Sequence, residues 1–484
     1  MAAVELRVDL SALVNALLSS DEAQIIAIAR DHLRQQEAAD VLIGRIGMIA
    51  AHGDEDGHIV TTLAAAAMLS RYLRFVPDPL HPDAEMRSLA SERALPLFAR
   101  ALLIAAPAVR RGYQASEQYP EPFFPSALVD TGKNVTEAMR EAVLSGDAQL
   151  VERLMLGFYG TGADYRTLQV RTYDGIAPTF QHAGHPLIFA VRGFQLLDPV
   201  EWGDRVPHII HWLAPHLPLH SATDEPEWVK IVRDFTSRPE NSVADVRKRI
   251  SMPQDEHALS LYRLILSNAD TLQVCQGVYD ALMKDNASPR AIGSVIERAS
   301  AEVMQRVRHD DAEGFVQSGH GLLFAAAARQ VFRQVQDVDV LTLLFTSAAC
   351  INALHKEVTA QQGGFQIPPA PVPVRVAGGL MGPQQLEALE EQLAGQDMQG
   401  ALTTARHYLS LKHDPRALFG VIGLAAARLK SGVDQGHRLQ IVQAASEAFL
   451  SWPSTLSKEN PEIFLQIALR AAIFGGRDSV VAQL

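Results

Sequence analysis

Four histidines each follow a glycine and each precedes an apolar stretch with helical spacing: Gly57–His58, Gly184–His185, Gly319–His320 and Gly436–His437. We therefore expect each histidine to lie in the first turn of a helix, where the positive end of the helix dipole disfavours a protonated ring. Neutral imidazole is the commonest metal ligand, and four such rings facing one point would bind iron, zinc, copper or manganese. The alternative is that each ring is only a polar helix cap bonded to a nearby carbonyl group.

Polar and aromatic side chains flank these histidines along the chain. Three polar residues are candidates to orient the rings: Asp56, Gln181 and Gln317. Four features are candidates for the walls of an apolar substrate pocket: Phe180, Phe189, Phe324 and the aromatic loop of residues 113–124. His208 and His211 also share a helical face, but the prolines around them leave room for only about two helical turns. We therefore do not expect a metal site at that pair.

The composition is that of a globular chain and argues against several other classes. Of the 484 residues 48% are apolar and 20% charged, with a net charge of −12 and only short basic clusters, so we expect no nucleic-acid partner. Cys275 and Cys350 are the only cysteines, too few for a disulfide framework or a four-cysteine cluster. The charged N-terminus lacks a signal sequence, and the longest apolar stretch, residues 101–109, is far too short for a membrane span. We expect a cytoplasmic protein without a membrane partner.

Apolar residues recur at helical spacing along most of the chain, and no stretch shows sustained strand alternation. The pattern predicts an all-α protein, a large multi-helical body of packed αα-hairpins with little or no sheet. Three junctions with an Asp after one or two small or polar residues support the hairpins: Ser19–Asp21, Ser145–Asp147 and Gly395–Asp397.

Composition also divides the chain. We expect an N-terminal helical body over residues 1–360 that carries His58, His185 and His320, and a Pro/Gly-rich linker over residues 361–382. Residues 383–484 then form a C-terminal helical part. Because His437 shares the context of the other three histidines, we expect this part to pack on the body and complete their site.

Three local expectations are less regular. Residues 167–173 favour a short extended segment. Pro107 is expected to end a helix over residues 85–109, because proline cannot continue one. Residues 257–285 have the pattern of a single amphipathic helix.

The order of these segments resembles the questin oxidase-like family. The matching features are His58 heading an apolar helix, Gly184–Ile188, His320 heading an Ala-rich helix, Ile367–Ala370, and a late helix with His437, Gln440 and Gln443. The resemblance implies an oxygenase that uses dioxygen to act on aromatic, polyketide-like small molecules. It also implies a non-haem Fe(II) centre held by His58, His185, His320 and His437, and NADPH as a possible co-substrate.

The chain departs from the family pattern at two places. The family's metal-binding lysine is expected about one helix after His320, where Thr346–Ala349 stands instead; Lys356 is the nearest substitute, about two turns later. The second histidine of the family's His-Pro-Leu-Ile-His segment is replaced by Phe189. These departures bear on the identity of the metal and on the activity.

We therefore expect a metal-dependent oxidoreductase or oxygenase that binds a divalent metal, Fe(II) by resemblance. The alternative is a non-catalytic helical scaffold or interaction protein whose histidines only cap helices. A haem protein that uses one of these histidines is a third possibility, which the absence of a Cys-x-x-Cys-His motif disfavours.

Overall fold

The computed structural model describes most of the chain. The described residues are 9–35, 37–77, 92–114, 119–162, 165–220, 225–248, 259–308, 311–335, 337–362, 382–430, 436–452, 461–473, 475–476, 478 and 480–484. The predicted linker over 361–382 lies outside these residues except at its two ends. Within the described residues the chain is built from helices and contains no strand, which confirms the all-α prediction.

The helices follow one another through short turns. In chain order they are α1 (Ser11–Ser19), α2 (Glu22–Arg34), α3 (Ala39–Ala51), α4 (His58–Tyr72), α6 (Leu95–Gly112), α7 (Val135–Leu144), α8 (Ala148–Gly160), α9 (Tyr165–Ile176), α10 (His185–Leu197), α11 (Val206–Leu213), α12 (Glu227–Ser237), α13 (Leu259–Ile265), α14 (Thr271–Met283), α15 (Pro289–Arg306), α16 (Ala312–Gln334), α17 (Thr342–Gln362), α18 (Gly382–Ala394), α19 (Met398–Ser410), α20 (Pro415–Ala427), α21 (His437–Leu450) and α22 (Glu462–Ile473). Short 3-10 turns lie between some of them, among them η5 (Ala214–His216).

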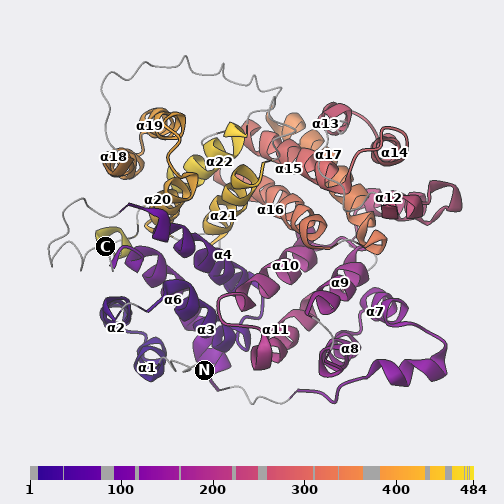
Figure 1. The fold of residues 1–484 in the computed structure, drawn as a ribbon, viewed down its shortest axis with the longest axis horizontal. Coiled ribbons are helices and arrows are strands. Elements are labelled where there is room, and N and C mark those ends of the chain that lie inside the picture. Colours follow the sequence, from indigo (N-terminus) through magenta and orange to yellow (C-terminus); the bar gives the residue numbers. More distant parts are fainter. Residues whose placement is uncertain are drawn as a thin grey trace.

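Four helices form a closed inner ring. α4 packs against α10 and α21, and α16 packs against the same two helices, so each member contacts two others. Figure 1 shows these four helices at the centre of the molecule, surrounded by the remaining helices. α3 and α6 cover α4, α9 and α11 cover α10, α15 and α17 cover α16, and α20 and α22 cover α21.

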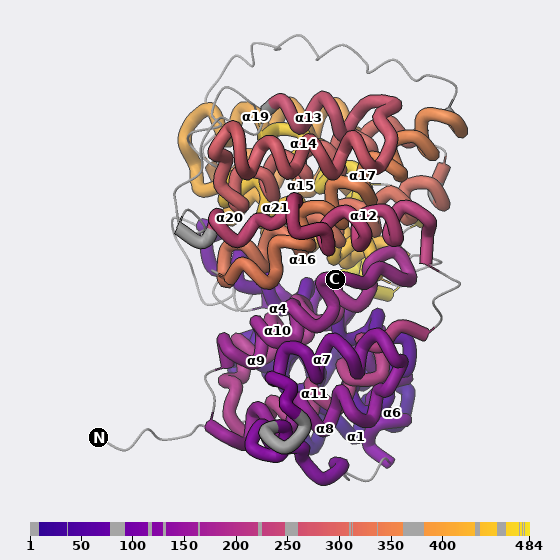
Figure 2. The backbone as a smooth tube through the Cα atoms, turned by 90° about the vertical axis from the view of Figure 1, so that its right-hand side faces the viewer, coloured from indigo at the N-terminus to yellow at the C-terminus, as the bar shows by residue number. Residues whose placement is uncertain are grey.

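The ring brings together distant parts of the sequence. α21 comes from the C-terminal part of the chain, yet it packs between α4 and α16 of the N-terminal part. In the side view of Figure 2, α4, α10 and α16 meet at the middle height, with indigo and magenta helices below and mainly orange helices above. The docking of the C-terminal helices places His437 at the same level as histidines from earlier helices.

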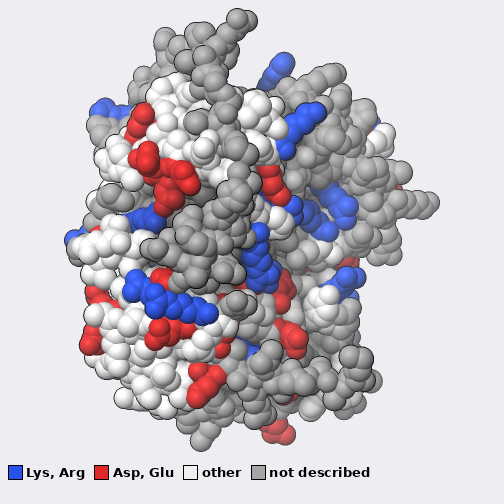
Figure 3. Space-filling view, turned by 60° about the vertical axis from the view of Figure 1, so that its left-hand side comes forward, with Lys and Arg blue, Asp and Glu red and all other residues white. Residues whose placement is uncertain are grey.

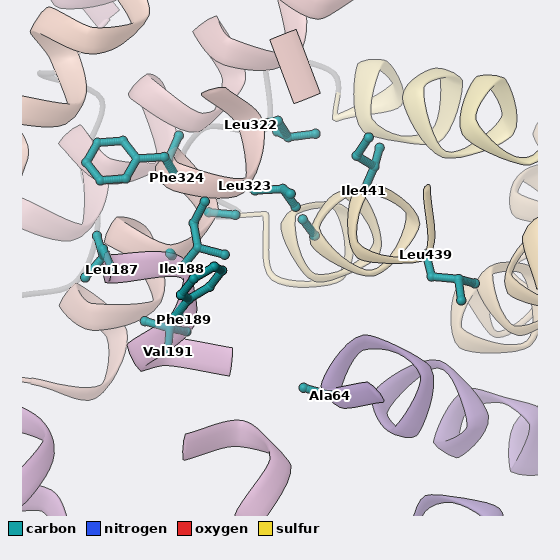
Figure 4. Packing of buried hydrophobic residues seen from close by; sticks show 14 of the residues in the cluster. Ala64, Leu187, Ile188, Phe189, Val191, Leu322, Leu323, Phe324, Leu439 and Ile441 are labelled. Carbon is teal, nitrogen blue, oxygen red and sulfur yellow. The ribbon is translucent and has the colours of Figure 1, made fainter. Parts of the chain in front are cut away.

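Buried apolar side chains from each inner helix fill the space around the ring. Figure 4 shows such side chains on all four inner helices, among them Ile188 of α10, Phe324 of α16, Ile441 of α21 and Ala64 of α4. All four are at most 2% exposed. Full burial of a large apolar side chain contributes about 1.5–3 kcal/mol, so the ring is held mainly by its own core.

The αα-hairpins form where the Asp junctions predicted them. Asp21, Asp147 and Asp397 cap α2, α8 and α19, each accepting a hydrogen bond from the backbone N–H three residues later. The residue before each Asp is left-handed, and this conformation reverses the chain direction. The paired helices α1–α2, α7–α8 and α18–α19 pack against each other.

Two local predictions were wrong. Residues 167–173 are helical, within α9, because Leu168, Thr172 and Ile176 all lie on the buried face of that helix. Packing of that face outweighs the strand preference of branched and aromatic residues. Pro107 does not end α6, which continues to Gly112. Pro107 lies on the exposed side of α6, so its ring faces solvent and the backbone hydrogen bond that proline cannot donate is lost on the solvent side rather than in the core.

The segment predicted as one helix over 257–285 contains two helices. α13 ends at Ile265 and α14 begins at Thr271, and Asp270 forms a capping box with Gln273 at the start of α14. The Ser267–Asp270 turn supplies polar groups that satisfy backbone donors. The amphipathic pattern continued across the turn because both helices pack on α15.

Surface charge is mixed on the face shown in Figure 3. Lys and Arg side chains there lie among Asp and Glu side chains, with neutral surface between them. The described residues on that face therefore do not form one broad basic surface.

One helical stretch among the described residues, 338–361, is long and apolar enough to cross a membrane by length and composition. Of its most apolar window 67% is buried inside the protein. Its apolar face is covered by α14, α15 and α16, as in the core helix of a globular protein.

Candidate metal centre

The four glycine-linked histidines lie together at one point. One ring nitrogen from each of His58, His185, His320 and His437 lies within 4.8 Å of the others. Neighbouring ring centroids are 4.8 Å apart for His58 and His185, 5.0 Å for His185 and His320, 4.4 Å for His320 and His437, and 5.1 Å for His437 and His58. The four imidazoles thus form a closed cycle in the same order as the four inner helices.

Three of the histidines are first residues of helices, as their sequence context predicted. α4, α10 and α21 begin at His58, His185 and His437. The glycine before each is left-handed, with φ of 79° at Gly57 and 86° at both Gly184 and Gly436. Only glycine adopts this conformation without strain.

Close packing gives a second reason for these glycines. A Cβ atom at Gly57 would lie 2.3 Å from the Phe189 ring, and one at Gly184 would lie 2.4 Å from the Phe324 ring. At Gly436 the added atom would lie 2.5 Å from a side-chain atom of Thr62. Each glycine therefore lets a helix start approach a neighbouring side chain closely, and this approach brings the histidines together.

His320 differs from the prediction, because it does not begin a helix. α16 starts at Ala312, capped by Asp311, and His320 is the ninth residue of this helix. Gly319 and Gly321 are helical and serve packing instead: a Cβ atom would lie 2.8 Å from Ile441 at the first and 2.5 Å from Leu354 at the second. The residues between Ala312 and Gly319 therefore form the first helical turns of α16.

Burial keeps at least two of the rings neutral. It lowers the pKa of His185 far below the ordinary value, and the neighbouring histidines lower it further. Burial and the nearby His437 and His58 lower the pKa of His320 to about 3. Both rings are therefore neutral near pH 7, the form that donates a lone pair to a metal.

Two nitrogens of the cluster have no hydrogen-bond partner. His58 Nδ1 and His185 Nε2 are both buried and unbonded. A buried polar atom left unpaired is costly, so His185 Nε2 favours a partner that the protein itself does not supply, whereas the Asp56 carboxylate lies 3.4 Å from His58 Nδ1. The donor set consequently fits a metal ion better than it fits helix capping.

The spacing also fits an ion, with a small contraction. At a metal–nitrogen distance of about 2.0–2.1 Å, two ligand atoms on opposite sides of an ion are at most about 4.2 Å apart. The widest separation in the cluster is 4.8 Å. Closure around one ion thus requires the rings to move by a few tenths of an ångström each.

Asp56 and Phe189 border the cluster. Asp56 Oδ1 accepts a hydrogen bond from the His58 backbone and lies 3.4 Å from His58 Nδ1, without hydrogen-bond geometry. The Phe189 ring stacks on His185 at 4.9 Å and meets His58 edge-on at 5.7 Å. Asp56 thus lies beside His58, and Phe189 covers one side of the cluster.

Other predicted neighbours do not act as expected. The Gln181 amide donates to the Pro218 carbonyl and accepts from the His220 backbone, so it orients a loop rather than a ligand. Gln317 is exposed. Phe180 packs edge-on against Phe324, and the Phe324 ring in turn lies next to Gly184.

The site expected for the family's lysine has no charged side chain. Thr346 and Ser347 are buried, and their hydroxyls donate to carbonyl oxygens of their own helix. Lys356 lies near His355, whose ring is bonded to Arg306 rather than to any of the four histidines.

A second histidine group lies where α3 and α11 pack together, and no pattern in the sequence predicts it. His52 Nε2 lies 2.7 Å from His208 Nδ1, and the Tyr119 hydroxyl lies 3.0 Å from the same nitrogen. His211 is bonded to Glu152 at 2.7 Å. Tyr119 of the aromatic loop is therefore part of this group and not of the predicted pocket wall. No spacing in the sequence links His52 to His208, 156 residues later.

Within the described part of the chain, no second group of three or more His, Cys, Asp or Glu side chains has metal-ligand spacing. Comparison of the chain with protein-family models, curated proteins and solved structures gave no match. The resemblance to the questin oxidase-like family thus stays a prediction.

Proposed function

We propose that the four histidines hold one divalent metal ion and that the protein is a metal-dependent oxidoreductase. The observation that carries this proposal is the meeting of His58, His185, His320 and His437 from four different helices, with ligand atoms within 4.8 Å. Four neutral nitrogen donors without a thiolate suit iron, zinc, copper or manganese. Fe(II) is the choice that the family resemblance favours.

The helix-cap alternative has less support at this site. The caps of α4, α10 and α21 are glycines with no side-chain hydrogen bond, so the histidines themselves do not cap these helices. Four imidazoles packed side by side would also leave buried nitrogens unbonded without any gain in stability. A scaffold would favour apolar side chains at the same positions.

The residues around the cluster have distinct tasks in this proposal. A bound iron ion would supply redox chemistry with dioxygen. Phe189, which packs against His185 and His58, excludes water from one side of the cluster. Asp56 orients His58, and the left-handed glycines fix the start of three ligand helices.

The proposal includes NADPH because of the family resemblance. It includes a cytoplasmic location because of the composition of the chain. NADPH would supply the two electrons that a monooxygenase needs, together with two protons, to reduce the second oxygen atom to water. Oxygen uptake by the Fe(II)-loaded protein, measured with aromatic phenols in the presence and absence of NADPH, tests the activity.

Metal titration of wild type and variants tests the site. After treatment with a chelator, the wild-type protein should bind one equivalent of Fe(II), Zn(II) or Mn(II). His58→Ala, His185→Ala, His320→Ala and His437→Ala should each lose most of this binding, because ligands of one ion act together. His413→Ala is the matched control, since His413 packs near Tyr408 and away from the cluster.

Two results would contradict the proposal. Equal metal content in all variants, or no binding by the wild type, would favour the scaffold alternative. A Soret band in the purified protein would instead favour a haem protein.

A further inference from the structure

The contact between α4 and α21 contains a buried polar bridge close to two of the proposed metal ligands. Figure 1 shows these two helices next to each other in the inner ring. The Gln440 side-chain amide donates hydrogen bonds to the Thr61 hydroxyl at 3.2 Å and to the Thr62 hydroxyl at 3.0 Å. All three side chains are at most 1% exposed. The bridge joins residues that lie 379 and 378 positions apart in the chain.

The bridge reaches the backbone of the first ligand residue. The Thr61 hydroxyl donates to the first turn of its own helix, where the carbonyl oxygens of His58 and Gly57 lie 2.9 Å and 3.1 Å away. On the other helix, Gln440 follows His437 by three residues, which is almost one full turn. A chain of two hydrogen bonds therefore runs from the helix of His437 to the helix start that carries His58.

Thr62 also limits the position of α21 by direct contact. A Cβ atom at Gly436, the residue before His437, would lie 2.5 Å from the Thr62 hydroxyl oxygen. The same hydroxyl accepts the hydrogen bond from Gln440. A slide of α21 along α4 would therefore break this hydrogen bond or press the backbone at Gly436 against Thr62.

Small shifts of α21 matter at the four histidines. Ligand distances around a bound ion vary by only about 0.2 Å, whereas a slip of one residue along a helix moves a side chain by about 1.5 Å. The His437 ring lies 5.1 Å from the His58 ring and 4.4 Å from the His320 ring, so a slip of this size would remove it from the shared point. Apolar packing is not directional, but an amide hydrogen bond requires an aligned donor and acceptor.

We propose that Gln440 is a positioning residue of the metal centre, which fixes the place of His437 relative to His58 before an ion binds. The inference rests on the proposed four-histidine centre and adds a residue outside its ligand set. Gln440 acts through Thr61 and Thr62 and is not itself a ligand. Residues that hold metal ligands in place typically change metal affinity by about 10–100-fold.

Zn(II) titration of the chelator-treated, full-length protein tests the role of Gln440. Gln440→Leu keeps a side chain of similar size but removes both hydrogen bonds. Its affinity for Zn(II) should fall about 10–100-fold, while the far-UV circular dichroism spectrum stays that of the wild type.

Gln443→Leu is the matched control on the same helix. Gln443 is 0% exposed and lies almost one turn further from His437. Its amide donates to the sulfur of Met68 at 3.4 Å, and a thioether is a weak acceptor. Gln443→Leu also removes a buried amide from α21, yet it should bind Zn(II) like the wild type.

A pair of variants at Thr62 keeps the test valid if Gln440→Leu does not fold. Thr62→Val removes the hydroxyl and keeps the branched shape, whereas Thr62→Ser keeps the hydroxyl. Thr62→Val should weaken Zn(II) binding, and Thr62→Ser should bind like the wild type. Because both single changes remove the same hydrogen bond, Gln440→Leu combined with Thr62→Val should lose less affinity than the two single losses together.

Absorption of the Co(II)-loaded protein separates positioning from a general loss of stability. The d–d bands of Co(II) depend on the number and the arrangement of its ligands. Gln440→Leu should therefore change the position or the intensity of these bands, and Gln443→Leu should leave them unchanged. A variant that is only less stable would keep the wild-type bands.

The outcomes for the inference and for the metal centre are distinct. Wild-type affinity and wild-type Co(II) bands in a folded Gln440→Leu variant would overturn the positioning role and leave the metal centre standing. Equal weakening by Gln440→Leu and Gln443→Leu would also overturn it. Absence of Zn(II) binding by the wild type would refute the metal centre and, with it, this role of Gln440.

Discussion

Replacing Gly184 with alanine tests whether the residue before His185, a proposed metal ligand, is required for its backbone shape and for its lack of a side chain. Gly184 has φ of 86°, and a left-handed conformation costs a residue with a Cβ atom about 1–2 kcal/mol. The added atom would lie 2.4 Å from the ring of Phe324, which is 2% exposed and cannot move into solvent. Displacement of a buried ring costs about 1–3 kcal/mol. We therefore expect a loss of about 2–5 kcal/mol in the free energy of unfolding.

Urea unfolding followed by circular dichroism measures this loss, and Gly162→Ala provides the control. Gly162 is also left-handed, with φ of 72°, but a Cβ atom there would have no neighbour within 4 Å. It should lose only the backbone cost of about 1–2 kcal/mol. If Gly184→Ala were no more destabilised than Gly162→Ala, the close approach to Phe324 would not matter, and the explanation of the Gly-His dipeptides would fail.

Three further changes test other parts of the structure. Burial raises the pKa of Asp174, which is paired with Arg140, to about 6, above its value in the unfolded chain. The contribution of this group to the free energy of unfolding is therefore fully present below about pH 4 and is lost as the pH rises toward 6. Unfolding free energies measured from pH 4 to 7 should show this loss for the wild type and not for Asp174→Asn. Arg329→Met leaves Glu297, paired at 2.9 Å and 2% exposed, as an unpaired buried charge; it should cost about 3–5 kcal/mol, and the double variant with Glu297→Leu should recover much of it in urea unfolding. Asp147→Ala removes the cap of α8 and should cost about 1 kcal/mol, visible as a lower melting temperature.

Much of the helical fold could be predicted from local signals. The Asp residues that cap α2, α8 and α19 are strong helix-start residues, and the hairpins they begin lie where the sequence placed them. The starts of α4, α10 and α21 followed from a glycine before an apolar helical pattern. These features depend on neighbours along the chain, so one sequence suffices to find them.

Features decided by tertiary packing were harder to predict. α9 is a helix because its buried face packs on α7 and α10, although its composition favours a strand. Pro107 is tolerated because it lies on the exposed side of α6. α16 begins two turns before His320, since Asp311 caps it earlier than the apolar run suggests.

The candidate site likewise combines features that have a local sequence signal with features that depend on tertiary packing. The types and contexts of His58, His185, His320 and His437 indicated a shared site, because repeated chemistry in repeated contexts is a local signal. The group formed by His52, Tyr119 and His208 carries no such signal, because it arises only where α3 and α11 pack together. The burial of Asp54 and its hydrogen bonds to the Val60 backbone and the Trp212 indole likewise appear only in the folded protein.

The most direct test of the metal centre is X-ray absorption spectroscopy of the protein loaded with one equivalent of Zn(II). The four-histidine centre predicts a first shell of nitrogen at about 2.0–2.1 Å, with outer scattering from about four imidazole rings. In His320→Ala the fitted number of imidazoles should fall, and the ion should be retained weakly or not at all. A wild-type spectrum with mainly oxygen neighbours and no more than two imidazoles would contradict a metal centre built from these four histidines.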